Sequence, residues 1–131
     1  MPLRLLIDTH IFLWACDEPG RINEFARRAI ATSANIVLVS AASAWEIAIK
    51  AASGKLDFPV ERWEEMAANL GFITLPISAA HALEAGSLPR HHTDPFDRML
   101  IAQARLGAFA LVTSDRKIAQ YDVRIFGAVA S

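Results

Sequence analysis

Short runs of mostly apolar residues alternate along this chain with longer stretches of helical periodicity. The clearest run, Ile36-Val37-Leu38-Val39, is apolar throughout and mostly β-branched, which is typical of a strand buried on both faces. Similar runs occupy residues 3–7, 72–75, 109–113 and, as an edge strand, 123–126. Strands of this kind need helices against both faces. The sequence therefore predicts an α/β fold of three layers, α/β/α, with a central, mostly parallel sheet of four to five strands.

Helix start and stop residues separate these strands. Ser40 is suited to cap a helix that runs to about Ser53, with Gly54 after its end. Asp94-Pro95 marks the start of a helix that stops at Gly107, because Asp is a preferred N-cap and Pro a preferred first helical residue. Further helices are predicted at residues 21–32, 59–70, 78–85 and 115–120, and one begins near His10.

Composition and charge limit the classes of protein that this chain can be. Its 131 residues, 53% hydrophobic and 21% charged, predict a single domain over residues 1–131 rather than a disordered chain. A formal net charge of −1 argues against a broadly basic nucleic-acid-binding domain. Cys16 is the only cysteine, so intrachain disulfides and thiolate zinc sites are excluded. No apolar run is long enough for a membrane span, and we expect a soluble cytoplasmic protein.

Four acidic residues fall just beyond predicted strand ends or near the start of a following helix. Parallel strands with right-handed crossovers bring strand carboxyl ends and helix N-termini to one edge of the sheet, where ligands bind in α/β folds. We therefore expect these carboxylates to meet at that edge. The four residues are Asp8, Glu46, Asp97 and Asp115.

Carboxylates that meet within a few ångström repel one another and need compensation. Divalent cations that prefer oxygen ligands supply it, and Mg²⁺ or Mn²⁺ fits a set of acids better than zinc, which favours His or Cys. Such metals activate water and stabilise the charge that develops when a phosphodiester is attacked. Arg98 and Arg116, each next to a proposed ligand, are suited to contact substrate phosphates.

Each acid also has a purely structural explanation. Asp8 and Asp115 could cap the helices that follow them, since Asp is a preferred N-cap. Asp97 could complement a helix dipole, and Glu46 could form a surface ion pair with Lys50. Taken singly, each of these explanations is as good as a metal site or better. Four coincidences at one edge, however, favour a single site.

Other polar residues near Asp97 are interpreted as structural. Helix capping explains Asp94 fully, and we leave it out of the catalytic set. His91 and His92 suggest a metal ligand or a catalytic base, but a polar loop before a helix is the favoured interpretation.

The four acids lie in four short motifs. These are Leu6-Ile7-Asp8-Thr9-His10, Ser43-Ala44-Trp45-Glu46-Ile47, His92-Thr93-Asp94-Pro95-Phe96-Asp97-Arg98 and Thr113-Ser114-Asp115. In order and spacing they resemble the motifs of PIN-domain ribonucleases, above all the VapC toxins of bacterial toxin–antitoxin pairs. The resemblance extends over essentially the whole chain, and its most specific part is Asp-Pro-Phe-Asp-Arg followed by an apolar helix.

The resemblance implies a Mg²⁺- or Mn²⁺-dependent endoribonuclease with an acidic quartet, here Asp8, Glu46, Asp97 and Asp115. Asp8 and Asp97 would bind the metal directly, and the other two acids directly or through water. Residues beside the acids would orient water or carboxylates; these are Thr9, Ser43 and Thr113.

The resemblance also implies a homodimer, a VapB-like antitoxin that blocks the active site, and an RNA substrate, either transfer RNA or ribosomal RNA. The expected function is hydrolysis of RNA phosphodiester bonds by a metal-activated water, as the toxin of a VapBC-type pair. The alternative is a PIN-like module that binds RNA or a protein without cutting. A phosphoaspartyl phosphatase is disfavoured, because its second Asp would stand two residues after the first, where this chain has His10.

Overall fold

Five strands form the sheet: β1 (Arg4–Ile7), β2 (Ile36–Ser40), β3 (Ile73–Leu75), β4 (Ala110–Thr113) and β5 (Ile125–Gly127). The computed structural model describes residues 2–127. Within them the strands are all parallel and lie in the order β3-β2-β1-β4-β5, so that Leu6 of the central strand pairs with Leu38 on one side and Leu111 on the other. The predicted parallel sheet is confirmed.

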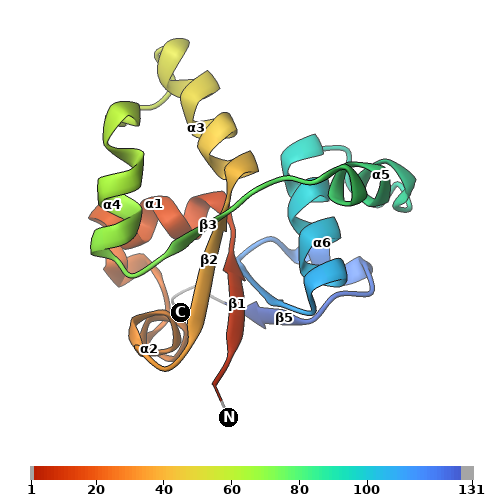
Figure 1. The fold of residues 1–131 in the computed structure, drawn as a ribbon, viewed down its shortest axis with the longest axis horizontal. Helices are drawn as coiled ribbons and strands as arrows, with labels where there is room; N and C mark the ends of the chain where they lie inside the picture. Colours follow the sequence, from red (N-terminus) through yellow and green to blue (C-terminus); the bar gives the residue numbers. More distant parts are fainter. Residues whose placement is uncertain (1, 128–131) are drawn as a thin grey trace.

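The described residues form six α-helices: α1 (Thr9–Asp17), α2 (Glu24–Ala31), α3 (Ala41–Ala52), α4 (Trp63–Asn69), α5 (Ala79–Ser87) and α6 (Pro95–Gly107). Helices α1, α2 and α4 lie on one side of the sheet and α5 and α6 on the other, while α3 extends beyond the end of β2 (Figure 1). This arrangement confirms the predicted three layers. No helix within residues 2–127 is long and apolar enough to cross a membrane.

Alternate residues of the central strands enter two separate hydrophobic cores, because successive side chains of a strand point to opposite faces. Leu5 and Ile7 of β1 belong to the core that contains Phe12 of α1. Leu6 belongs to the other core, with Leu100 of α6. Both faces of the strands are therefore buried, which explains why these runs are apolar at nearly every position.

Several helices are shorter than the sequence predicts. Helix α2 starts at Glu24 because Asn23 caps it, with Asn23 Oδ1 accepting a hydrogen bond from Ala26 N at 2.7 Å. The start of the helix predicted at 59–70 is a 3₁₀ turn, Val60–Arg62, and the helix predicted at 115–120 is a 3₁₀ helix, Arg116–Gln120. These differences move the ends of elements and leave the order of strands and helices as predicted.

The end of α6 differs in detail from its prediction. We expected Gly107 to stop the helix, but Gly107 is its last residue, and the left-handed residue that follows is Ala108, with φ 56° and ψ 42°. Gly107 is needed for a different reason. A Cβ at this position would overlap with the ring of Phe109, which folds back over the helix end.

The left-handed conformation of Ala108 generates a stability prediction. Ala108→Gly is expected to raise the free energy of unfolding by about 0.5–1 kcal/mol, because the greater backbone entropy of unfolded Gly offsets only part of the cost of left-handed Ala. Gly107→Ala, one residue earlier, is expected to lower it. Urea unfolding of the two variants checks both signs, and a destabilised Ala108→Gly would contradict the assignment.

Candidate metal centre

Asp8 stands at the carboxyl end of β1 and is held there by hydrogen bonds to both carboxylate oxygens. Its N–H donates to the carbonyl of Val112 at 3.0 Å, which extends the pairing with β4. Its Oδ1 accepts from Ile11 N at 2.8 Å and caps α1. Its Oδ2 accepts from Thr113 Oγ1 at 2.6 Å. Asp8 is 5% exposed, so its orientation is set by buried partners.

Asp115 follows the neighbouring strand, β4, and is oriented in the same way. Its N–H donates to Thr113 Oγ1 at 3.0 Å, so that Thr113 links the backbone of Asp115 to the carboxylate of Asp8. Asp115 Oδ1 accepts from Lys117 N at 2.9 Å and caps the 3₁₀ helix. Its other oxygen, Oδ2, lies 3.0 Å from His92 Nε2 in a hydrogen bond.

Asp97 completes the cluster from the first turn of α6. Asp94 caps this helix as expected, because its Oδ1 accepts from the N–H groups of Phe96 and Asp97 at 2.8 and 3.2 Å. Asp97 Oδ2 lies 3.0 Å from His92 Nε2. One ligand atom each from His92, Asp97 and Asp115 lies within 4.8 Å of the other two, which is close enough for one cation to be shared.

His92 is the site residue that we missed in the sequence. It does precede a helix, but its side chain is only 11% exposed and faces two carboxylates. His91, its neighbour, packs edge-on against the ring of Tyr121 instead, with 5.1 Å between ring centroids. The one local indication of this role was the His-x-Asp spacing, since His92 Nδ1 accepts from the N–H of Asp94, the helix cap, at 3.2 Å.

Burial and neighbouring carboxylates disfavour the ionised forms of Asp8 and Asp97 in the protein without metal. Burial, together with the carboxylates of Asp94, Asp8 and Asp115, raises the pKa of Asp97 from 3.8 to about 7, and His92 acts in the opposite direction. Burial also raises the pKa of Asp8, although the hydrogen bonds from Thr113 and Ile11 act in the opposite direction. A divalent cation would relieve both effects, since it favours the ionised carboxylates that bind it.

Like Asp8, Glu46 does not belong to the group of His92, Asp97 and Asp115 whose ligand atoms lie within 4.8 Å of one another. It is buried on α3, 7% exposed, and its Oε2 pairs with Lys50 Nζ at 2.9 Å. Ser43, one helical turn earlier and therefore on the same face, accepts a hydrogen bond from Thr9 Oγ1 at 2.9 Å. Thr9 directly follows Asp8, so this bond connects the face that carries Glu46 to the start of α1.

The two arginines expected near phosphate differ in their surroundings. Arg98 is half-buried, and its guanidinium donates to the backbone carbonyls of Ala85, Leu88, Pro89 and His92. This gives Arg98 a structural role that we did not expect from the sequence. Arg116 is exposed, and it lines an open cavity of about 380 Å³ together with Ser114 and Asp115.

The side chains present fit a hard divalent cation. Three buried or half-buried carboxylates from distant parts of the chain, Asp8, Asp97 and Asp115, lie within electrostatic reach of one another. Carboxylate oxygens suit Mg²⁺ and Mn²⁺, and the cluster offers no thiolate. The arrangement is therefore suited to bind such an ion at the edge of the sheet and to present it to an anionic substrate.

Comparisons with known proteins find similar sequences and similar folds. A family model described as PIN domain matches residues 5–124. Ribonuclease VapC22 of Mycobacterium tuberculosis (strain ATCC 25618 / H37Rv) is 32% identical over 118 residues, which make up 87% of this chain and 88% of that protein.

Two solved structures share the fold. VapBC2 from Rickettsia felis, bound to a promoter DNA fragment, matches with a TM-score of 0.72 and 13% identity over 96% of this chain and 99% of that chain. DNA-bound VapBC from Salmonella typhimurium matches with a TM-score of 0.70 and 16% identity over 95% and 98% of the two chains.

The raised pKa of Asp97 generates a prediction for the metal-free protein. Between pH 4 and 7 folded Asp97 holds a proton that the unfolded chain has lost, so this residue makes stability fall as pH rises through that range and then level off. Once the carboxyl group is ionised, each unit by which folding raises its pKa lowers the free energy of unfolding by about 1.4 kcal/mol. Asp97→Asn removes this ionisation and is therefore expected to raise the free energy of unfolding at pH 8 by at least about 1 kcal/mol.

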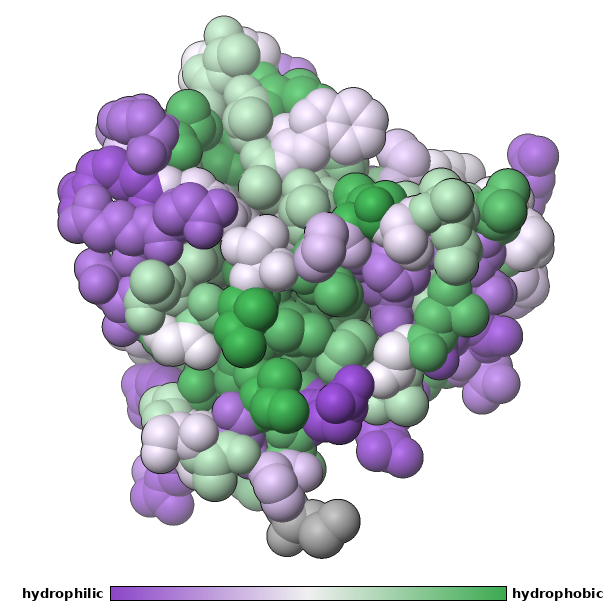
Figure 2. Space-filling view, in the orientation of Figure 1, coloured by the Kyte–Doolittle hydropathy of each residue, from purple (hydrophilic) through white to green (hydrophobic). Residues whose placement is uncertain are grey.

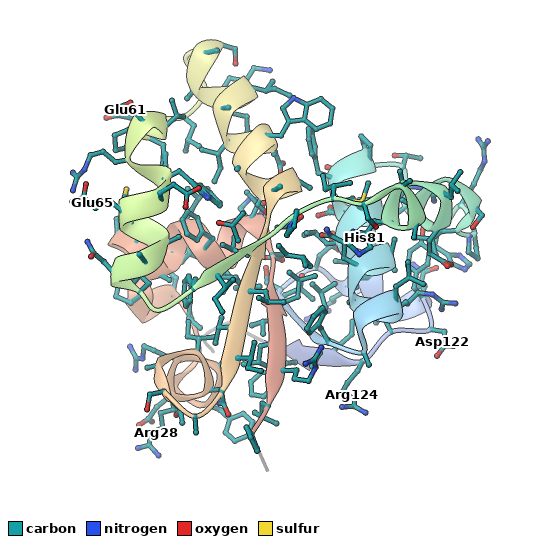
Figure 3. All side chains as sticks on the ribbon, viewed as in Figure 1. Arg28, Glu61, Glu65, His81, Asp122 and Arg124 are labelled. Carbon is teal, nitrogen blue, oxygen red and sulfur yellow. The ribbon has the colours of Figure 1, made fainter. Side chains whose placement is uncertain are left out.

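Urea unfolding in EDTA at pH 5 and pH 8 measures this difference. The matched control is Asp122→Asn, because the Asp122 side chain is fully exposed at the surface (Figure 3) and its 3.6 Å ion pair with Arg105 is of the exposed kind that contributes little to stability. If Asp97→Asn instead loses up to about 1 kcal/mol at pH 8, Asp97 acts mainly on the helix dipole, and the repelling cluster is excluded.

Proposed function

The chain belongs to the PIN-domain family, and from this premise we propose that it is a divalent-metal-dependent endoribonuclease that hydrolyses RNA phosphodiester bonds. The observation that carries the proposal is that ligand atoms of His92, Asp97 and Asp115 lie within 4.8 Å of one another, with Asp8 near enough for its charge to act on Asp97. The 32% identical relative is named a ribonuclease, which supports the same activity here.

We propose Mg²⁺ or Mn²⁺ as the metal, with Asp8 and Asp97 as direct ligands and with Glu46 and Asp115 acting directly or through water. Such an ion supplies Lewis acidity to a phosphoryl oxygen and acidifies water. The hydroxyl of Thr113 holds one oxygen of Asp8, while the Thr9–Ser43 hydrogen bond holds α1 against α3. These residues keep the carboxylates oriented without offering ligands of their own.

Substrate contacts are proposed beside this cluster. Arg116 is exposed next to Asp115, and its guanidinium is suited to bind a phosphate of the RNA backbone. We do not retain Arg98 for this role, because four backbone carbonyls already accept from its guanidinium. We propose transfer RNA or ribosomal RNA as the target and the cytoplasm as the site of the activity.

We further propose that the chain is the toxin of a VapBC-type pair and is blocked by a VapB-like antitoxin. Two solved structures that share its fold are VapBC assemblies bound to DNA, which supports such a partner. A homodimer is supported by exposed apolar side chains on β3, on the segment that follows it, and on α5, including Ile73, Ile77 and Leu83. Figure 2 shows apolar surface in the middle of this face.

The activity proposal predicts metal-dependent cleavage. Purified protein free of antitoxin is expected to cleave RNA with Mn²⁺ or Mg²⁺ and to stop when EDTA is added. Asp8→Asn is expected to lower the rate more than about 100-fold, because even groups that only hold metal ligands cost about 10–100-fold when they are removed. Gel analysis of a defined RNA measures the rate.

Asn at position 8 keeps an oxygen that can cap α1, so this variant is expected to fold. Asp122→Asn, on the exposed surface, is the matched control and should cleave at the wild-type rate. Persistent cleavage by folded Asp8→Asn would assign the activity to a contaminant or to another site. RNA binding without any cleavage by the wild-type protein would favour the alternative, a non-catalytic PIN-like module.

The homodimer proposal predicts a change in mass. Leu83 is 77% exposed on α5, and Leu83→Asp is expected to convert dimers to monomers by placing a charge in the apolar contact. Phe25, 75% exposed on α2 across the sheet, supplies the control, since Phe25→Asp should leave the dimer intact. Light scattering after size-exclusion chromatography measures both masses, and a monomeric wild type would refute the proposal.

A further inference from the structure

The segment between α5 and α6 is clamped by the guanidinium of Arg98. Arg98 Nη2 donates to the carbonyls of Ala85 and Leu88 at 2.9 and 2.8 Å, and Nη1 donates to those of Pro89 and His92 at 2.8 and 3.2 Å. Arg98 stands one residue after Asp97 on α6. The same turn of helix therefore carries a proposed metal ligand and the group that holds the preceding loop.

Tyr121 holds the same loop beside Arg98, whose Nη1 also donates to the Tyr121 hydroxyl at 3.5 Å. Its hydroxyl accepts from His92 N at 2.8 Å and donates to the carbonyl of Pro89 at 2.8 Å. Tyr121 is 6% exposed and its ring belongs to the core on the α6 side of the sheet. The backbone at His92 is thus fixed by two side chains that are themselves anchored in the fold.

The imidazole of His92 has a defined tautomer. Because Nδ1 accepts from the N–H of Asp94 at 3.2 Å, the ring proton is assigned to Nε2. Nε2–H then donates to Asp115 Oδ2 at 3.0 Å and lies 3.0 Å from Asp97 Oδ2. One donor therefore faces two carboxylates that otherwise repel each other.

We propose that His92 is a positioning residue of the metal centre, which orients the carboxylates of Asp97 and Asp115 so that they converge on one cation, and that Arg98 and Tyr121 hold His92 in place. This inference rests on the proposed metal-dependent function and adds three residues to it. Groups that hydrogen-bond to metal-binding carboxylates set ligand orientation, and their loss costs about 10–100-fold in metal affinity.

Direct metal binding by His92 is the competing role, and the hydrogen bonds oppose it. A metal at Nε2 needs the lone pair of that nitrogen, which moves the proton to Nδ1. Nδ1–H would then face the N–H of Asp94, and two donors would replace a hydrogen bond. The observed pattern assigns His92 as a donor to the ligands.

Mn²⁺ titration by calorimetry, without RNA, tests the role of His92. His92→Leu is expected to weaken Mn²⁺ binding about 10–100-fold. His92→Gln should restore most of the affinity, because its amide N–H can reach the position of Nε2–H. His91→Leu is the matched control, since His91 is exposed and its edge-on contact with Tyr121 involves the ring and not the hydroxyl that holds the loop, and it should bind as the wild type does.

A second variant tests the clamp without touching the imidazole. Tyr121→Phe keeps the buried ring and removes the hydroxyl's three hydrogen bonds, to His92 N, to the Pro89 carbonyl and to Arg98, so we expect Mn²⁺ affinity to fall about 2- to 10-fold. Near-ultraviolet circular dichroism establishes that each variant is folded. If His92→Leu does not fold, the other two variants still test the proposal. It then requires that His92→Gln bind Mn²⁺ nearly as well as the wild type and that Tyr121→Phe bind it more weakly.

Unchanged or tighter Mn²⁺ binding by folded His92→Leu would overturn the positioning role. Binding by His92→Gln that is as weak as that of His92→Leu would also overturn it, in favour of direct ligation by the imidazole. If the wild-type protein itself binds no Mn²⁺, the proposed metal-dependent function fails as well, which distinguishes that failure from the first two.

Discussion

Repulsion among buried carboxylates at one edge of a parallel sheet is the constraint around which this molecule is organised. Asp8, Asp97 and Asp115 come from three distant points of the chain, and burial together with mutual repulsion raises the pKa of Asp97 to about 7. The fold tolerates this arrangement because hydrogen-bond donors surround it. These include the Thr113 hydroxyl, two helix N-terminal N–H groups and the imidazole of His92.

Capping and site roles are combined in the same carboxylates. Asp8 and Asp115 each use Oδ1 to cap the helix that follows, and each directs Oδ2 toward the cluster or the residues that hold it. This is possible because a carboxylate has two oxygens and because helix N-termini and strand ends share one edge in this topology. The structural and functional explanations of these acids, which compete in the sequence, are therefore compatible in the fold.

Interactions between residues close in sequence could be predicted, and interactions between distant residues could not. Asp94 as the cap of α6 and Ser40 as the cap of α3 were predicted because capping involves neighbours within three residues. His92 and Arg98 were not, because their partners depend on the path of the loop between α5 and α6. An arginine side chain beside a proposed metal ligand is long enough to contact either a substrate phosphate or backbone carbonyls of the protein. The local sequence does not distinguish these two outcomes.

The sequence by itself determined the layered α/β fold, the parallel sheet and the edge at which the acids gather, because apolar periodicity and helix caps act locally and the handedness of crossovers is general. Only the tertiary structure decided which side chains pair there. His92 meets Asp97 and Asp115, and Arg98 turns to the backbone. Such pairings depend on ångström-scale distances between separate elements, and those distances exist only after the two cores have packed.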